Sequence, residues 1–268
     1  MAVTNFIQTI WSKKILDELE LKTKLVENCH RQYEGDCKYA GSVNILGVGD
    51  PTVGDYTGAD INIETMSDTM QTLLIDQAKY FAFYVDDVDK AQSVPGLPEE
   101  FRRKSVHALA TARDSFIASK IKEGTNVTTA KSLSGADVKA AIDAAIVALR
   151  KRNFDEEGVI EIDPETYNVL KDAIAELSTN NPDYIKTGKI GTYNGMDVIM
   201  SNNMATDGTH VYCDVRGKKA IAFAGQIDKV EACRAEKRFA DIVKGLDVYG
   251  AKVIDNDRIQ VVKVPKAS

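Results

Sequence analysis

The stretch PGLPEEFRRKSVHALATARDSFIASKIKEG, residues 95–124, decides the fold because it predicts one long helix. Pro98 suits the first turn of a helix, and Glu99 and Glu100 place negative charge at the positive end of the helix dipole. Gly124 supplies the stop. The apolar stripe between them consists of Phe101, Ala108, Leu109, Ala112, Phe116 and Ile117. At 1.5 Å per residue the helix would be roughly 35–40 Å long, which suits the spine of a domain.

The net charge changes sign where this helix begins. Residues 41–100 hold eleven acids against two lysines, a net charge of −9, whereas residues 101–153 hold eleven basic residues against four acids, a net charge of +7. Segments of opposite sign could pair within one molecule or between copies of it, where charge complementarity fixes register. A solvated acidic loop beside an ordinary charged helix is the plainer interpretation.

The composition is that of a soluble globular protein, with 44% hydrophobic and 28% charged residues. At 268 residues the chain has room for one large domain or two smaller ones. The net charge of −6 argues against a dedicated nucleic-acid binder, though not against a container whose wall tolerates DNA. No secretory signal and no apolar run of about 18–20 residues is present, so we expect no membrane span. With no signal, reduced thiols are expected at the four cysteines, Cys29, Cys37, Cys213 and Cys233.

The sequence before the long helix and the sequence after it predict different kinds of secondary structure. Before it, residues 4–28 predict an amphipathic helix with Trp11 on its apolar stripe, and residues 39–98 predict extended chain rich in Gly, Asp, Thr and Val. After it, Ser134 predicts the N-cap of a helix that ends near Asn153. A strand at 159–162, a helix from Asp163, a hairpin at Asn194-Gly195 and strands at 210–215, 219–224, 229–234, 246–254 and 258–264 follow. The pattern predicts an α+β fold.

No stretch of the chain carries a complete catalytic or ligand-binding motif. Residues 47–54, GVGDPTVG, have Thr52 where a dinucleotide fingerprint needs its third glycine, and no phosphate-loop lysine follows. Residues 86–89, DDVD, lack the ligand spacing of a calcium loop. His210 and Cys213 have the spacing of zinc ligands, but a strand would point them to opposite faces. None of the three histidines stands in a nucleophile motif, so we expect no catalytic residue, no cofactor and no metal.

Several stretches, taken in their order along the chain, carry a family resemblance. They are IWSKKIL at 10–16, VGDYTG at 53–58, IDQAKYFAFYVDDVDKAQ at 75–92 and YNGMDVIMSN at 193–202. Together with the long helix, they resemble the major capsid (coat) proteins of tailed bacteriophages, which have the Hong Kong 97-type fold. The resemblance implies a non-catalytic protein of the virion that self-assembles, in the bacterial host cytoplasm, into the icosahedral head shell around double-stranded DNA.

The resemblance also implies a division of the chain. Residues 1–40 would be an N-arm that reaches a neighbouring subunit, and residues 41–92 an extended loop (E-loop) that lies over an adjacent one. Residues 93–133, with the spine helix, would form a peripheral domain, residues 134–222 an axial domain, and residues 223–268 strands that return to the peripheral domain. The implied partners are the chain itself in pentamers and hexamers, scaffolding and portal proteins, and DNA bound without sequence specificity.

The charge split acquires a hypothetical use in such a shell. The acidic loop, through Asp50, Asp55 and Asp60, would lie on the basic surface of a neighbouring subunit. Exposed ion pairs contribute only about 0–1 kcal/mol each, but many copies act together in a closed shell. The candidate basic contacts are Arg102, Arg103, Lys104 and Arg113, and Trp11 is a candidate contact of the arm.

Three other interpretations stay open on the sequence alone. An encapsulin-type compartment shares the fold but packages cargo enzymes. A soluble α/β enzyme or ligand-binding protein would use residues 41–92 as a lid over a site built from dispersed side chains. A different head or tail structural protein is the third, and the pattern of the spine helix disfavours it.

Overall fold

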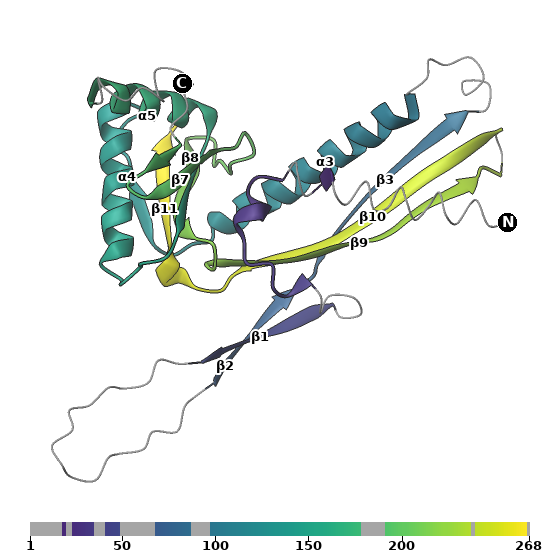
Figure 1. Ribbon diagram of the computed structural model, residues 1–268, viewed down its shortest axis with the longest axis horizontal. Helices are drawn as coiled ribbons and strands as arrows, with labels where there is room; N and C mark the ends of the chain where they lie inside the picture. Colours follow the sequence, from purple (N-terminus) through teal and green to yellow (C-terminus); the bar gives the residue numbers. More distant parts are fainter. Residues whose placement is uncertain are drawn as a thin grey trace, which may run out of the picture.

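A computed structural model describes residues 18–19, 23–34, 41–48, 68–86, 97–177, 191–236 and 239–266 of the chain. It consists of a compact lobe, an elongated lobe beside it and a hairpin that projects from the place where the two lobes meet (Figure 1). Most of the helix predicted over residues 4–28 lies outside the described residues. Within it, the 3-10 helix η1, Val26–Asn28, lies between the lobes.

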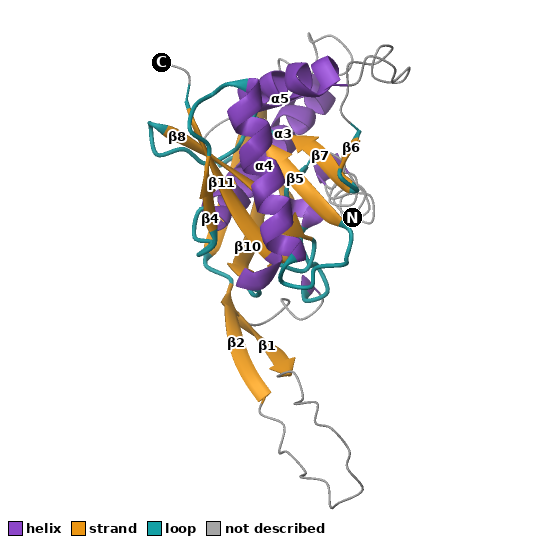
Figure 2. Ribbon diagram, turned by 90° about the vertical axis from the view of Figure 1, so that its left-hand side faces the viewer, coloured by secondary structure: helices purple, strands orange, loops and turns teal. Residues whose placement is uncertain are grey.

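The compact lobe is built on a six-stranded sheet with the strand order β4-β11-β8-β5-β7-β6. Helix α4 packs on this sheet, and α5 packs against α4 (Figure 2). The helices are α4, Gly135–Arg150, and α5, Pro164–Leu177. The strands are β4, Val127–Thr129; β5, Gly158–Ile162; β6, Thr192–Tyr193; β7, Met196–Met200; β8, His210–Gly217; and β11, Ile259–Pro265, which follows the 3-10 helix η3, Asn256–Arg258.

The elongated lobe is a three-stranded antiparallel sheet with α3, Leu97–Ile121, along one face. Its strands are β3, Gln77–Asp86; β9, Ile221–Arg234; and β10, Ala240–Val253, with β10 in the centre. A small core of Val106, Leu109, Ala110 and Val243, with Leu19 against it, joins helix and sheet. The last turns of α3 continue into the core of the compact lobe through Ile117 and Ile121, so this helix spans both lobes.

The projecting hairpin pairs β1, Ser42–Val48, with β2, Asp68–Leu74, in antiparallel register from Ser42↔Leu74 to Val48↔Asp68. Only two residues separate β2 from β3. Since β3 pairs with β10 along its whole length, residues 77–86 are a strand of the elongated lobe. A lid made of residues 41–92, the alternative considered above, is therefore wrong for that part of the segment.

Local sequence explains where the elements of the compact lobe begin and turn. The Ser134 side chain accepts a hydrogen bond from the Asp137 backbone and caps α4, as predicted. Asp163 caps α5 in the same way, through the Glu165 backbone. Asn194 and Gly195 have φ angles of 50° and 81°, as a tight hairpin turn between β6 and β7 requires.

Two of the differences from the sequence prediction concern β9 and β11. The strands predicted at 219–224 and 229–234 are one continuous strand, β9, because residues 225–228 carry the pairing with β10 onward past a register shift at Leu246/Asp247. The last strand, β11, does not join the elongated lobe with β9 and β10. It lies in the six-stranded sheet between β4 and β8, so residues 223–268 divide between the two lobes.

Candidate intersubunit surfaces

The hairpin β1–β2 has one buried and one exposed face. Val43, Ile45 and Leu73 point inward and pack at its base against Ala222 and Ala224 of β9. Alternation along the strand turns the opposite side chains of β2 to solvent. Among them, Met70 is 65% exposed and Leu74 is 60% exposed. The hairpin therefore holds large apolar side chains in solvent on an arm that extends away from the body (Figures 1 and 2).

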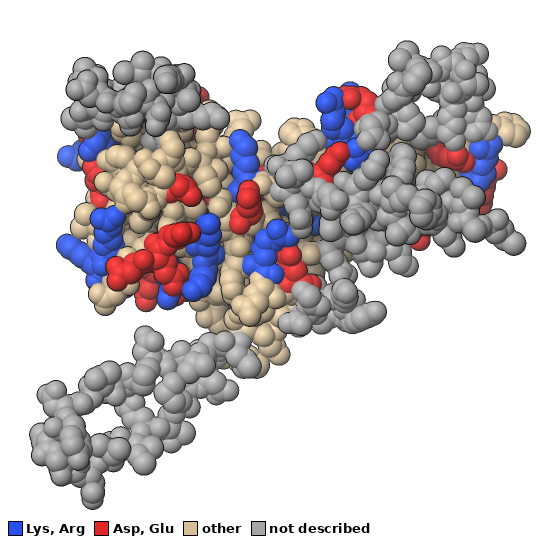
Figure 3. Space-filling model, viewed as in Figure 1, with Lys and Arg blue, Asp and Glu red and all other residues tan. Residues whose placement is uncertain are grey.

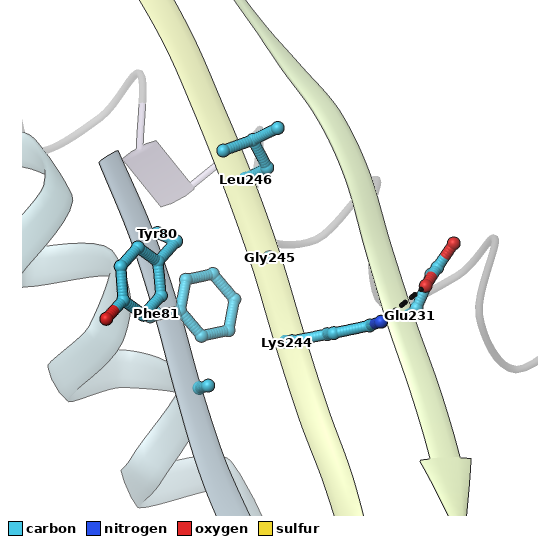
Figure 4. A pocket seen from close by; sticks show the side chains of 7 residues that line it. Tyr80, Phe81, Glu231, Lys244, Gly245 and Leu246 are labelled. Atoms are coloured by element: carbon cyan, nitrogen blue, oxygen red, sulfur yellow. Dashed lines mark ion pairs between the residues drawn. The ribbon is translucent and has the colours of Figure 1, made fainter. Parts of the chain in front are cut away.

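The sheet of the elongated lobe also carries an exposed apolar face, on the side away from α3. Tyr80 is 78% exposed and Tyr84 is 57% exposed, and both lie on β3. Beside Tyr80 is an apolar groove of about 450 Å³, lined also by Phe81 and Leu246 (Figure 4). One side of this groove is an ion pair between Lys244 and Glu231, 3.1 Å long, and that hydrogen bond raises the pKa of Lys244.

Gly245 allows Phe81 to lie across the central strand at this groove. A Cβ atom at position 245 would come within 2.5 Å of Phe81 Cζ, closer than carbon atoms approach. The aromatic ring therefore occupies the space that any other residue at this position would need.

Two of the candidate basic contacts are used inside the chain. Arg113 is buried, donates from Nε to Asp247 Oδ2 at 2.8 Å, and lies over the rings of Phe223 and Tyr249. Arg102 is buried as well and pairs with Glu18 at 2.6 Å. Because both guanidinium groups bind acids of their own chain, we remove Arg102 and Arg113 from the intersubunit hypothesis.

The other candidate contacts remain predictions. Arg103 and Lys104 are exposed on α3, and Arg103 pairs with Glu100 at 2.7 Å, a hydrogen bond that raises its pKa. The remaining candidates, Trp11, Asp50, Asp55 and Asp60, lie outside the described residues.

Charges of both signs are interspersed on the face of the compact lobe that Figure 3 shows. Within this lobe, Glu156 pairs with Arg258 at 2.6 Å and with Lys219 at 3.2 Å. Hydrogen bonds from these two cations lower the pKa of Glu156. Such exposed pairs neutralise each other locally, so the described residues of this face mix charges of both signs.

The histidine–cysteine pair of β8 does not converge. His210 turns to the surface, where its ring contacts Thr209 and Asp207, whereas Cys213 is buried against Asp163. Across the part of the chain that the structure describes, no group of three or more His, Cys, Asp or Glu side chains could hold a metal ion. Over the same residues, no helix is long and apolar enough to cross a membrane.

The sequence reasoning missed a fully buried ionic cluster of Arg216, Glu161 and Asp214. A signal for it exists in the strand sequence. Asp214 and Arg216 stand two residues apart in the otherwise apolar strand β8, so they share one face, and Glu161 is the register partner of Asp214 on β5.

Comparison with known proteins decides the family. The model of a family described as "Phage capsid protein" matches residues 67–264, most of the chain. The chain belongs to the phage capsid protein family. A solved structure titled "Mycobacterium phage Che8" is 32% identical to this capsid protein, with a TM-score of 0.76 and 90% of each chain covered. The protein is thus a non-catalytic subunit of the phage head shell, with the Hong Kong 97-type fold.

More distant structures share the fold alone. A chain from the capsid of cyanophage P-SCSP1u is 18% identical, covers 89% of this chain and 86% of its own, and has a TM-score of 0.69. A chain from a virus-like particle of Pyrococcus furiosus is 12% identical, with coverages of 96% and 99% and a TM-score of 0.62. No curated protein sequence matches the chain.

Proposed function

We propose that hairpin β1–β2 is the extended loop with which this capsid protein grips an adjacent subunit of the shell. The observation that carries the proposal is the pair of large apolar side chains, Met70 and Leu74, on the exposed face of a projecting hairpin. Burying a side chain of this size contributes about 1.5–3 kcal/mol when it is complete. A neighbouring subunit in the shell offers that burial.

The exposed face of the elongated lobe is the surface we assign to the receiving subunit. Tyr80, Tyr84 and Leu246 present aromatic and aliphatic area there, and the apolar groove beside Tyr80 has room for an inserted side chain. Aromatic residues in a concave apolar setting are the usual anchors of protein interfaces. The exposed face of the hairpin and the exposed face of the elongated lobe suit each other, since both are apolar and both are formed by strands.

Membership of the family supports the remaining roles that we propose. We propose that α3 with β3, β9 and β10 forms the peripheral domain and that the compact lobe forms the axial domain near the five- and six-fold centres. The subunits would form pentamers and hexamers around double-stranded DNA, with scaffolding and portal proteins as partners during assembly.

Electron microscopy of purified protein, paired with size-exclusion chromatography, tests the role of the hairpin. The double variant Met70→Glu/Leu74→Glu is expected to fold and to lose closed particles, because it places charge in an apolar contact. Val147→Glu is the matched control, since Val147 is 50% exposed on α4, away from the hairpin. Particles from the hairpin variant in the same yield as from the wild type would overturn the assignment. If the wild type itself does not assemble, the same comparison is made with the neighbouring genes coexpressed.

A further inference from the structure

The segment Thr23–His30, here named the strap, is bonded to both lobes. On the side of the elongated lobe, the Asp114 carboxylate of α3 accepts hydrogen bonds from the strap backbone. The three donors are the N–H groups of Lys24 at 3.0 Å, Leu25 at 3.1 Å and Val26 at 3.4 Å. One buried side chain of the long helix therefore holds the start of η1.

The compact lobe holds the middle of the strap, while two backbone hydrogen bonds join His30, at its end, to Ile221 and Phe223 of β9. Arg216 of β8 donates from Nη1 to the Asn28 carbonyl at 2.6 Å and from Nη2 to the Leu25 carbonyl at 3.3 Å. The Asn28 side chain in turn donates to Glu161 of β5 at 3.2 Å. The attachment to the compact lobe thus runs through the buried ionic cluster that the sequence did not predict.

This cluster holds two carboxyl groups for one guanidinium group. Arg216 lies 3.0 Å from Glu161 and 3.0 Å from Asp214, and all three side chains have no exposed surface. Arg216 Nε lies 3.0 Å from Asp214 Oδ2, but neither oxygen of Asp214 accepts a well-aligned hydrogen bond from the described residues. With both acids ionised, the core would hold a net negative charge, which is costly to bury. A single proton makes the cluster neutral.

The groups around Asp214 favour that proton on it. Glu161 faces it from β5 and Arg216 from β8, while β11 places the uncharged Val261 opposite. The strap adds the buried thiol of Cys29, and α3 adds the Asp114 carboxyl with Lys24 beside it. Burial, followed by the negative charge of Glu161, raises the pKa of Asp214 well above its usual range. Burial also raises the pKa of Glu161, which Arg216 opposes.

We propose that the strap is a releasable clasp between the two lobes, held by Asp114 on one side and Arg216 on the other, and weakened when Asp214 loses its proton. An ionised Asp214 competes with the Asn28 and Leu25 carbonyls for the donors of Arg216. Asp214 binds its proton more tightly when the strap is closed than when it is open. It is therefore stable at low pH, and it weakens as pH rises from the ordinary range of a carboxyl group toward the raised pKa of Asp214.

The strap contains its own reporter. Cys29 is 6% exposed, and burial raises its pKa to about 12, so it reacts with an alkylating reagent only when the strap opens. Cys213 is 1% exposed on β8, on the opposite face from Asp214, and reports opening of the compact lobe itself. Peptide mass spectrometry after a pulse of N-ethylmaleimide distinguishes the two thiols in the full chain.

The experiment compares the wild type with Asp214→Asn from about pH 5 to about pH 9, so that the window begins just above the ordinary range of a carboxyl group. The measured quantity is the rate of Cys29 labelling in the wild type divided by the rate of Cys29 labelling in Asp214→Asn at the same pH. This ratio is expected to rise by up to about tenfold per pH unit below the raised pKa of Asp214. Cys213 should stay protected throughout. Asp197→Asn, which removes an exposed acid of β7, should behave as the wild type does.

Two results would overturn the clasp. One is the same pH dependence of Cys29 labelling in the wild type and in Asp214→Asn. The other is joint labelling of Cys29 and Cys213, which would mean that the whole lobe opens. If Asp214→Asn does not fold, the wild type alone decides, because a ratio of Cys29 to Cys213 labelling that stays constant with pH contradicts the proposal. The test concerns one chain, so its outcome is independent of the role proposed for the hairpin.

Discussion

Removing one partner of the buried pair between Arg113 and Asp247 should strongly destabilise the elongated lobe. Arg113 binds both carboxylate oxygens of Asp247, and the two side chains are 6% and 0% exposed. Replacing Arg113 by Met keeps much of the side-chain volume but leaves a buried carboxylate without its cation. Breaking a buried pair in this way costs about 3–5 kcal/mol. We expect Arg113→Met to lower the free energy of unfolding by that amount.

Urea denaturation followed by circular dichroism measures the effect, and a second variant isolates its cause. Arg113→Met/Asp247→Leu removes both charges, so it should recover most of the lost stability, because the cost lies in the unpaired charge. Lys104→Met, on the exposed side of the same helix, should change stability by no more than about 0.5 kcal/mol. A cost below about 1 kcal/mol for Arg113→Met, or no recovery in the double variant, would refute the reasoning.

Three further predictions use other parts of the chain. Gly245→Ala should lower the free energy of unfolding by about 1–3 kcal/mol in thermal or urea denaturation, because its methyl group meets the Phe81 ring, and Phe81→Leu in the same chain should restore part of the loss. Gly195→Ala should cost about 1 kcal/mol in the same assay, from backbone strain, since its φ is 81° and no atom of the described residues lies within 4 Å of the added methyl group. Arg103→Glu/Lys104→Glu should leave the melting temperature unchanged and reduce particle yield in light scattering most strongly at low salt, and equal yields at every salt concentration would remove both residues from the interface.

The elements that the sequence predicted well are those with strong local signals. The long helix begins at Leu97, as the Pro98 and acidic first turn required, and its described bounds end at Ile121, just before Gly124. Ser134 and the Asn194-Gly195 turn act as predicted because a cap or a tight turn depends only on neighbours within a few residues. Strand order is a different matter. Nothing local in Ile259–Pro265 says that it pairs with β4 and β8 instead of β9 and β10.

Segment charges alone do not identify the partners of an ion pair, for a similar reason. The counts of −9 and +7 left open whether the acidic segment pairs with the basic helix in one molecule, between copies, or not at all. In the structure, Arg102 takes its partner from Glu18 and Arg113 takes its partner from Asp247, and neither acid belongs to the segment 41–100. An ion pair forms where the fold brings two side chains together, so a charge sum over contiguous sequence cannot identify the partners.

The division between buried and exposed charges therefore separates folding from assembly in this capsid protein. A substitution at Arg113 or Asp247 breaks a pair inside one subunit, so it should lower the stability of the free chain before any shell forms. A substitution at Arg103 or Lys104 changes an exposed group, whose effect on a single chain is small because solvent screens it. A shell repeats each contact many times, so small changes in the free energy of one contact add up over the whole shell. A change inside the subunit instead alters the free energy of unfolding of each chain separately. Measuring stability and particle yield on the same set of variants distinguishes the two kinds of residue.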